Sequence, residues 1–393
     1  MERSSIQPGT YEYFRQERVI FGKPLEQAIG EALASRDAER IFVVSTRTLS
    51  RATDVVARLR AALGNRFAGL FDEVRSHVPR QSAVAAAAAA RAARPDLLIA
   101  IGGGSALDTG KMVQLCLAEN VTLPSQLDAF RVRTDAAGVT TIPEIRTPPF
   151  RQIAIPTALS GAEWSHTTGS TDTERHIKDI YIQADLAAPA VILDPAITLH
   201  TPMWVWLSSG MRAVDHAIGS LCSRRANPFT DATTLRALGM LNRSLRRIVD
   251  APDDLDARLE SLVAVWLAST GMMRMQYGAS HGLSWHLSAI ADVPHGDCSC
   301  VLMPAVLRYN EPVNAVQQGQ ISEALGHPGL PAADAVLDLV RAVGRPHRLR
   351  DVGITREHID VICHDAMGNL LVRNNPRPID RPEQVREILD LAW

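Results

Sequence analysis

Three consecutive glycines follow an apolar run at residues 97–101: Gly102, Gly103 and Gly104. The apolar residues are typical of a strand buried in a parallel sheet. Glycines at the end of a strand let the backbone adopt positive φ and approach a ligand closely. Ser105 could cap a following helix, whose free N–H groups favour an anion, and Asp108 and Lys111 lie on the next turns. The stretch therefore predicts a phosphate-binding turn between a strand and a helix.

The glycines alone do not identify the ligand. The stretch lacks the G-x-G-x-x-G order of the common dinucleotide fingerprint, and it lacks the G-K-[ST] ending of an ATP-binding loop. A tight turn with a purely structural role is the alternative that remains open.

Strand and helix patterns alternate on both sides of this turn. The expected strands are residues 17–21, 41–45, 67–74, the apolar run before Gly102, 152–156 and 191–194. The expected helices are residues 24–34, 50–63 and 83–93, and a further helix that follows the glycines and continues through Leu117. This alternation predicts a doubly wound α/β domain that binds a nucleotide at the carboxyl ends of its strands. Residues 128–149, rich in proline, threonine and charge, are expected to form a loop or flap.

A second turn of small residues, from Thr157 to Gly161, follows the strand expected at residues 152–156 and includes Ser160. Beyond residue 202 the pattern changes to long helices, including residues 205–222, 228–248, 254–274 and 279–290. We therefore expect an α/β dinucleotide-binding domain with a parallel sheet at residues 1–198. An all-α substrate and catalytic domain is expected at residues 199–393.

Composition excludes several classes of function. The formal net charge is −2, and no run of Lys and Arg alternates with aromatic residues, so a nucleic-acid surface is not expected. No apolar run is long enough to span a bilayer, and Met1 to Ser5 lead into a polar segment, so we expect no membrane partner and a cytoplasmic protein. The five cysteines have no paired CxxC spacing. A small-molecule substrate is the remaining expectation.

Candidate catalytic residues lie in the helical half. Arg212 and His216 are four residues apart and share one face of a helix. His281 lies on another expected helix, and His295 lies in the expected turn Pro294-His295-Gly296. The three histidines could converge on one pocket. Each could equally be a hydrogen-bonded helix histidine with no catalytic role.

With these motifs, the chain resembles the iron-containing, or group III, alcohol dehydrogenase superfamily, which includes glycerol dehydrogenase and is related to dehydroquinate synthase. The matching segments run in family order along nearly the whole chain: residues 102–111, 155–163, 192–195, 209–217, 281 and 294–296. The resemblance implies a pyrophosphate on Gly102 to Ser105, and a nicotinamide near Thr157 to Gly161.

In the metal-dependent members, an aspartate and three histidines bind Fe²⁺ or Zn²⁺. By this resemblance His216, His281 and His295 occupy the histidine positions, but Arg212 occupies the aspartate position. A guanidinium cannot ligate a metal and stays protonated, so it would repel a divalent cation. No metal is therefore expected. Asp215 should point about 100° away from His216 around the helix and pair with Arg212.

Within the superfamily, the chain most resembles maleylacetate reductase, whose members also lack the aspartate. The supporting segments are residues 17–22, 225–228, 302–310 and 375–379. The resemblance implies hydride transfer from NADH or NADPH to the ketone of a small keto acid, in the catabolism of aromatic compounds, by a homodimer. His281, His295 and Arg212 would stabilise the charge on the carbonyl oxygen, and a histidine with a pKa near neutrality could deliver the proton.

The cofactor preference depends on Thr46. The superfamily often has an aspartate here that binds the adenine ribose and disfavours a 2′-phosphate, so we expect NADPH to be accepted. The alternative role of Thr46 is to cap the next helix. Two alternative functions remain: a dehydrogenase of alcohols or polyols that binds a metal through His216, His281 and His295 alone, and a catalytically silent binding protein. Elimination chemistry like that of dehydroquinate synthase would need the metal.

Overall fold

The computed structural model describes residues 10–13, 15–134, 139–175 and 177–393. The prediction of a cytoplasmic protein used the segment Met1 to Ser5, which lies outside the described residues. The chain forms two compact units, which meet in sequence between Thr201 and Pro202. Residues 10–12 belong to the second unit. Among the described residues, no helix is both long and apolar enough to cross a membrane.

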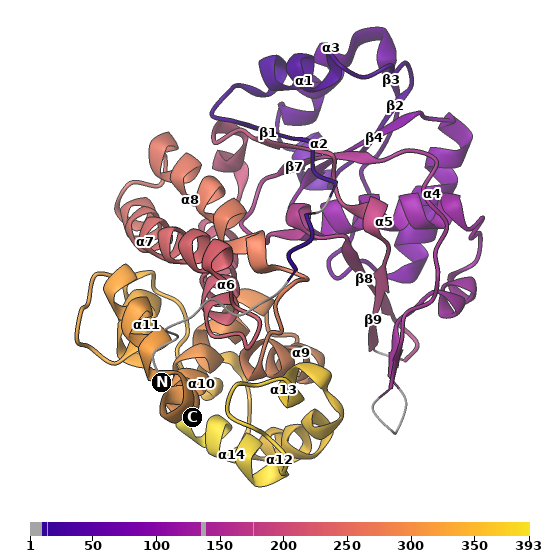
Figure 1. The fold of residues 1–393 in the computed structure, drawn as a ribbon. Coiled ribbons are helices and arrows are strands. Elements are labelled where there is room, and N and C mark those ends of the chain that lie inside the picture. The colour runs from indigo at the N-terminus through magenta and orange to yellow at the C-terminus, as the bar shows by residue number, and fades with distance from the viewer. Residues whose placement is uncertain (1–9, 14, 135–138, 176) are drawn as a thin grey trace. The chain divides into compact units, whose positions relative to one another are not determined.

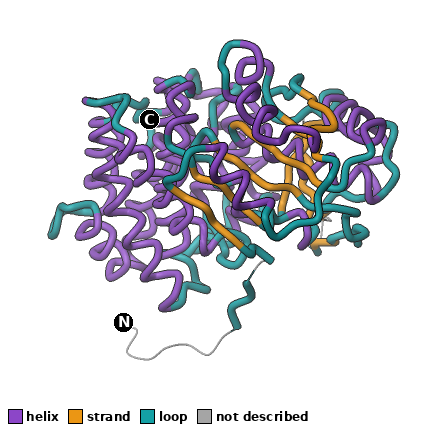
Figure 2. The backbone as a smooth tube through the Cα atoms, turned by 90° about the horizontal axis from the view of Figure 1, so that it is seen from above, coloured by secondary structure: helices purple, strands orange, loops and turns teal. Residues whose placement is uncertain are grey.

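The first unit contains a parallel sheet of six strands in the order β1-β10-β7-β4-β2-β3. The strands are β1 (Arg18–Phe21), β2 (Ile41–Val44), β3 (Phe67–Phe71), β4 (Leu97–Gly102), β7 (Gln152–Pro156) and β10 (Ala190–Leu193). Successive side chains of β2 and β4 enter two different hydrophobic cores, because side chains alternate between the faces of a sheet. Helices therefore cover both faces (Figure 2), and the predicted α/β class is confirmed.

The helices of this unit are α1 (Leu25–Leu33), α2 (Arg47–Arg51), α3 (Val55–Leu63), α4 (Arg80–Ala93) and α5 (Gly104–Ala118), shown in Figure 1. Helices α1 and α3 contribute to one core, and α4 and α5 contribute to the other. One prediction was wrong in detail. The single helix expected at residues 50–63 is two helices, since Thr46 starts α2 early and the chain turns at Ala52 before α3 begins.

Two short antiparallel sheets were not predicted. The strands β8 (Thr167–Asp172) and β9 (Ile177–Ile182) form a hairpin, and β5 (Arg133–Thr134) pairs with β6 (Thr140–Thr141) inside the predicted loop. Strand β8 consists of threonine, serine, glycine and aspartate, whereas β9 mixes isoleucine and tyrosine with lysine and aspartate. The hydrophobic signal is therefore missing in β8.

The second unit is helical over residues 202–393, all of which are described. Its helices are α6 (Met203–Leu221), α7 (Pro228–Asp250), α8 (Leu255–Ala268), α9 (Ala279–Ala291), α10 (His295–Ala324), α11 (Ala332–Ala342), α12 (Arg356–Asp365), α13 (Leu370–Arg373) and α14 (Pro382–Leu391). This confirms the predicted helical half. His295, predicted in a turn, is instead the first residue of α10, because Pro294 is its N-cap.

A glycine brings the start of α10 onto α6. A Cβ at Gly296 would lie 1.9 Å from the backbone oxygen of Ser208, so no other residue fits without moving one helix. This close approach places the first turn of α10 beside the part of α6 that carries Arg212 and His216. The geometry explains the glycine that follows His295 in the sequence.

Candidate functional site

The glycine turn lies where β4 meets α5. Gly102 has φ +146°, and a Cβ there would lie 2.8 Å from the Cβ of Ala106. Gly103, with φ −74°, is the N-cap of α5, and no side chain caps the helix. The prediction that Ser105 caps the helix was therefore wrong, since Ser105 is already within its first turn. The uncapped N–H groups of this turn remain available to an anion.

The second small-residue turn lies directly beside the first. Gly102 on β4 pairs with Pro156 on β7, and the Thr157 N–H donates to the Gly102 carbonyl at 2.9 Å. A Cβ at Gly104 would lie 2.9 Å from the Oγ of Ser160. The two turns therefore form one narrow cradle at the carboxyl ends of neighbouring strands, where α/β sheets bind nucleotides.

Lys111 does not belong to this cradle. Its side chain is fully buried, and its ammonium donates to the Asp108 carboxylate at 3.1 Å and to the carbonyls of Ala162 and Thr167 at 2.7 and 2.9 Å. Because these contacts use all three N–H bonds, Lys111 has none for a phosphate. We therefore withdraw it as a cofactor contact. Asp108, which binds Lys111, has the same structural role.

Thr46 caps the short helix α2. Its hydroxyl accepts from the Leu49 N–H at 3.3 Å, so the predicted capping role is confirmed. Its methyl group would lie 3.9 Å from a Cβ at Gly102, which places Thr46 at the edge of the cradle. Arg47, next to it, pairs with Glu73. The backbone of Thr46 also forms an isolated β-bridge with Glu73.

In the helical unit, two of the predicted histidines lie together. The rings of His216 on α6 and His281 on α9 are 5.2 Å apart between centroids. Tyr277 stacks on His281 at 4.2 Å. A Cβ at Gly219 would lie 2.6 Å from the Tyr277 ring, so this glycine makes room for the stack. His295 lies close enough to His281 to lower the pKa of His281.

His295 is oriented by a serine. The Oγ of Ser288 lies 3.1 Å from the Nδ1 of His295 and 2.7 Å from the Val293 carbonyl. Because the hydroxyl has one proton and gives it to the carbonyl, it accepts a hydrogen bond from Nδ1. This arrangement places a proton on Nδ1 of His295.

Arg212 and Asp215 form the predicted pair on α6, with 3.2 Å between Nη1 and Oδ2. The pair is not on the surface, since the side chains are 14% and 2% exposed. The contact of Asp215 with another helix was not predicted. Its carboxylate lies 3.5 Å from the Nδ1 of His281 on α9.

Burial and positive charge lower the pKa values of His216 and His281 well below the ordinary value. For both, the largest cause is loss of water, followed by the nearby guanidinium of Arg212. Both rings are therefore neutral at neutral pH. The predicted pKa near neutrality does not hold for either ring without a ligand.

The donor set does not fit a divalent cation. Arg212 brings a fixed positive charge to the histidines. In the part of the chain that the structure describes, the ligand atoms of His216, His281 and His295 do not converge within metal-binding distance of one another.

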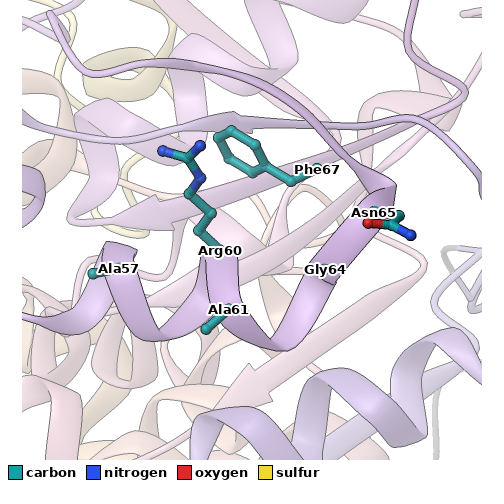
Figure 3. Close-up of a pocket in the computed structure, with 6 residues that line it drawn as sticks. All are labelled: Ala57, Arg60, Ala61, Gly64, Asn65 and Phe67. Carbon is teal, nitrogen blue, oxygen red and sulfur yellow. The ribbon is translucent and has the colours of Figure 1, made fainter.

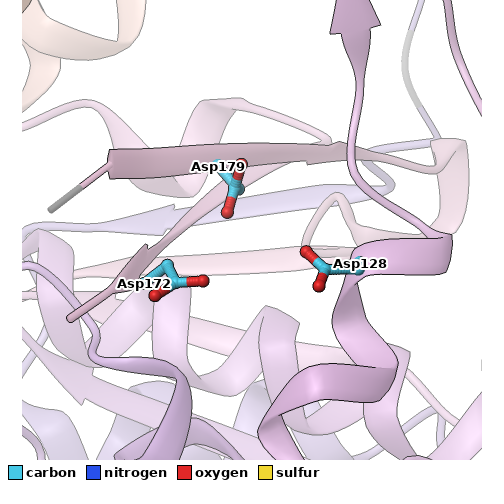
Figure 4. Close-up of side chains that lie close together, drawn as sticks. All are labelled: Asp128, Asp172 and Asp179. Carbon is cyan, nitrogen blue, oxygen red and sulfur yellow. The ribbon is translucent and has the colours of Figure 1, made fainter. Parts of the chain in front are cut away.

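Asp128, Asp172 and Asp179 do converge, as Figure 4 shows. Arg80, which is 3% exposed, reaches all three at 2.9, 3.1 and 2.7 Å, and Arg175 adds further contacts. The hydrogen bond from Arg175 is the largest cause that lowers the pKa of Asp172 to about 2. These residues form an ion-pair network that connects the β8–β9 hairpin to α4. The guanidinium groups of Arg80 and Arg175 supply the positive charge that a metal ion would otherwise bring to the three carboxylates.

One hollow lies away from these groups, and another lies beside Asp215 and His281. The larger, of about 590 Å³, is open and lies at the amino end of β3, where Arg60 stacks over Phe67 (Figure 3). It is at the opposite edge of the sheet from the glycine cradle. The smaller, of about 40 Å³, lies beside Asp215 and His281. It has room for about one or two water molecules but not for a substrate.

Sequence reasoning missed three residues of the histidine cluster: Tyr277, Ser280 and Ser299. Ser299 follows His295 by four residues, so helical spacing could have placed it on the same face once α10 was known to begin at His295. Ser280 and Tyr277 carry no comparable signal, because nothing in the sequence shows that they face α6.

Comparison with known proteins gives two family matches. Residues 16–195 match the iron-containing alcohol dehydrogenase model, and residues 206–393 match the C-terminal model of the Fe-containing alcohol dehydrogenase family.

Individual relatives match over most of their length. Dehydrogenase ALT3 of Alternaria alternata is 32% identical over 89% of this chain and 98% of its own. Maleylacetate reductase of Pseudomonas sp. (strain P51) is 29% identical over 93% of this chain and 92% of its own. The crystal structure of maleylacetate reductase from Agrobacterium tumefaciens superposes with a TM-score of 0.82 at 25% identity, covering 99% of each chain.

Proposed function

Because the chain belongs to the iron-containing alcohol dehydrogenase family and is an oxidoreductase, we propose that it reduces the ketone group of a small keto acid with NADH or NADPH. The observation that carries the proposal is Arg212, a half-buried cation beside two neutral histidines. By the resemblance, it stands where the metal-dependent relatives have an aspartate. The similarity to maleylacetate reductases supports a substrate with a carboxylate.

The α/β unit would hold the cofactor. Backbone N–H groups at Gly103, Gly104 and Ser105 would donate to the pyrophosphate, since no side chain caps this helix. Thr157 and Ser160 lie beside the glycines and would contact the rest of the dinucleotide. When bound, NADH or NADPH supplies the hydride.

Arg212 would bind the substrate carboxylate. Its Nη1 is used by Asp215 and Ser299, while its Nε and Nη2 hydrogen-bond to none of the described residues. Two N–H groups on one guanidinium suit a bidentate contact with a carboxylate. The same contact would hold the ketone in a fixed orientation.

His281 would donate the proton to the substrate. Reduction places negative charge on the carbonyl oxygen, and a protonated imidazole can stabilise and then neutralise it. Without ligands His281 is neutral, but an anionic substrate nearby would favour its charged form. Substrate binding should therefore be accompanied by proton uptake. His216 and His295 are the neighbouring donors.

The proposal includes no metal, since Arg212 and the geometry of the histidines do not fit one. The second candidate is a metal-dependent dehydrogenase of alcohols or polyols that uses His216, His281 and His295. The iron-containing members of the family favour it.

A matched pair of substrates tests the proposed function. NADH and NADPH oxidation should be measured with 2-, 3- and 4-oxo acids and with a 4-oxo acid methyl ester, which keeps the ketone and removes the charge. We expect the acid to be preferred. Arg212→Ala should lower kcat/KM for the acid about 10- to 100-fold and leave the ester nearly unchanged. Arg308→Ala, which removes an exposed arginine on α10, is the control.

A substitution at Gly103 tests the proposed cofactor site. Gly103 has ordinary φ, and a Cβ there meets nothing nearer than Ala158 at 3.8 Å, so Gly103→Val should fold. It should lose cofactor binding, because the side chain would occupy the place of the pyrophosphate. A parent protein that oxidises neither cofactor with any keto acid would contradict the function. So would an Arg212→Ala variant that loses acid and ester equally.

A further inference from the structure

The Asp215 carboxylate accepts hydrogen bonds from more groups than its ion-pair partner Arg212 alone. One oxygen, Oδ2, accepts from Arg212 Nη1 at 3.2 Å, from Ser280 Oγ at 3.0 Å and from Ser299 Oγ at 2.7 Å. His281 Nδ1 lies 3.5 Å from the same oxygen. These donors come from α6, α9 and α10, so a single carboxylate joins the three helices that carry the predicted catalytic residues.

The position of Asp215 favours one tautomer of His281. The carboxylate lies 3.5 Å from Nδ1, which is longer than an ordinary hydrogen bond, and a negative charge there favours the neutral ring that carries its proton on Nδ1. Its Nε2 is then the nitrogen with a free lone pair. Nε2 is buried and has no hydrogen-bond partner among the described residues, and His281 is 4% exposed.

Ser299 stabilises the arrangement from both sides. Its hydroxyl donates to Asp215 and accepts from Arg212 Nη1 at 3.1 Å. The Nη1 amino group of Arg212 thus donates to both Asp215 and Ser299, and these contacts fix the orientation of the guanidinium plane. The same carboxylate thus orients both groups that the proposed function assigns to the substrate.

We propose that Asp215 is a positioning residue, which holds His281 in the Nδ1-protonated form and fixes the guanidinium of Arg212, with Ser280 and Ser299 as supporting donors. Asp215 itself need not touch the substrate. The inference rests on the proposed function for its kinetic consequence. Its structural consequence, the protonated nitrogen of His281, is independent of any substrate.

The first test is spectroscopic. Protein labelled with ¹⁵N-histidine is measured at pH 7.5 by long-range ¹H–¹⁵N correlation, with His281→Gln to assign the signal. We expect Nδ1 of His281 to appear as a protonated nitrogen and Nε2 as a non-protonated one. In Asp215→Asn the amide can donate to Nδ1, so the signals should move toward the other tautomer. Asp297→Asn, which breaks a buried pair with Arg345, should leave them unchanged.

The second test is kinetic. Asp215→Asn should lower kcat for the keto acid about 10- to 100-fold, as loss of an orienting partner does elsewhere, and leave cofactor Kd unchanged. Asp297→Asn should retain parent kcat. If Asp215→Asn does not fold, Ser299→Ala decides, because it keeps the buried charges and removes one donor. A lower kcat in folded Ser299→Ala supports the proposal, and parent kcat contradicts it.

Two results overturn the proposal: a parent His281 protonated on Nε2, or a folded Asp215→Asn with parent kcat. A third result separates the two proposals: a parent protein that has no keto-acid activity but whose His281 is protonated on Nδ1. It would contradict the proposed function and leave the positioning of His281 supported.

Discussion

Arg212 shows how one residue changes the chemistry that a shared fold can perform. By the resemblance, His216, His281 and His295 correspond to metal-binding positions of relatives, but here a cation lies close to them on α6. Burial and then the positive charge of Arg212 lower the pKa values of His216 and His281, and Asp215 forms an ion pair with that charge. The residue type was readable from the sequence. The balancing role of Asp215 was not, because it depends on donors from two other helices.

Glu163 allows a test of buried charge in the α/β unit. It is 1% exposed, and burial raises its pKa from 4.5 to about 7. Because the folded pKa is above the unfolded one, the folded state keeps a proton that the unfolded state has lost. The stability that this provides is present below pH 4.5 and is lost as the pH rises toward 7. Above pH 7 the fold holds a buried charge.

Glu163→Gln should remove this pH dependence. Between pH 5 and pH 8, the stability of the variant relative to the parent should rise by about 3 kcal/mol, since one pKa unit corresponds to about 1.4 kcal/mol. Urea unfolding at both pH values, followed by circular dichroism, measures the change. A difference between variant and parent that is the same at both pH values would show that Glu163 is not protonated in the fold.

At the scale of elements, apolar patterns predicted the structure well where they were strong. The buried strands β2, β4 and β7 and the helices α6 and α7 lie within a few residues of their predicted places. The β8–β9 hairpin was missed because β8 has no apolar pattern, and because ion pairs around Arg80 help Tyr181 of β9 to hold the hairpin in place. The position of His295 was missed because a proline before it can end one helix or begin the next.

The N-terminus of α2 should control the choice of cofactor. Thr46→Asp keeps a capping side chain, so the helix should form as before. Its carboxylate would repel the 2′-phosphate of NADPH. We expect kcat/KM with NADPH, relative to NADH, to fall about tenfold or more.

Thr46→Asn is the matched control, since it also caps but carries no charge. Its cofactor ratio should stay near that of the parent. Equal ratios for Thr46→Asp, Thr46→Asn and the parent would show that position 46 does not face the ribose.

At the scale of the whole molecule, each unit has one proposed task. The unit Tyr13–Thr201 contains the glycine cradle, and the unit from Pro202 to Trp393 contains Arg212 and the histidines. The family models match both units in order. The resemblance noted in the sequence therefore gave the family and the fold. The assignment of substrate and cofactor to separate units, and the homodimer, remain predictions.

The central claim is that this chain reduces a keto acid without a metal ion, with Arg212 in place of the metal-binding aspartate. The most direct test is kcat/KM for keto-acid reduction before and after dialysis against a chelator, with metal content measured by mass spectrometry. We predict the same kcat/KM once no transition metal is detected, and no increase when Zn²⁺ or Fe²⁺ is added. Activity that disappears with the metal and returns with one equivalent of either ion would contradict the account.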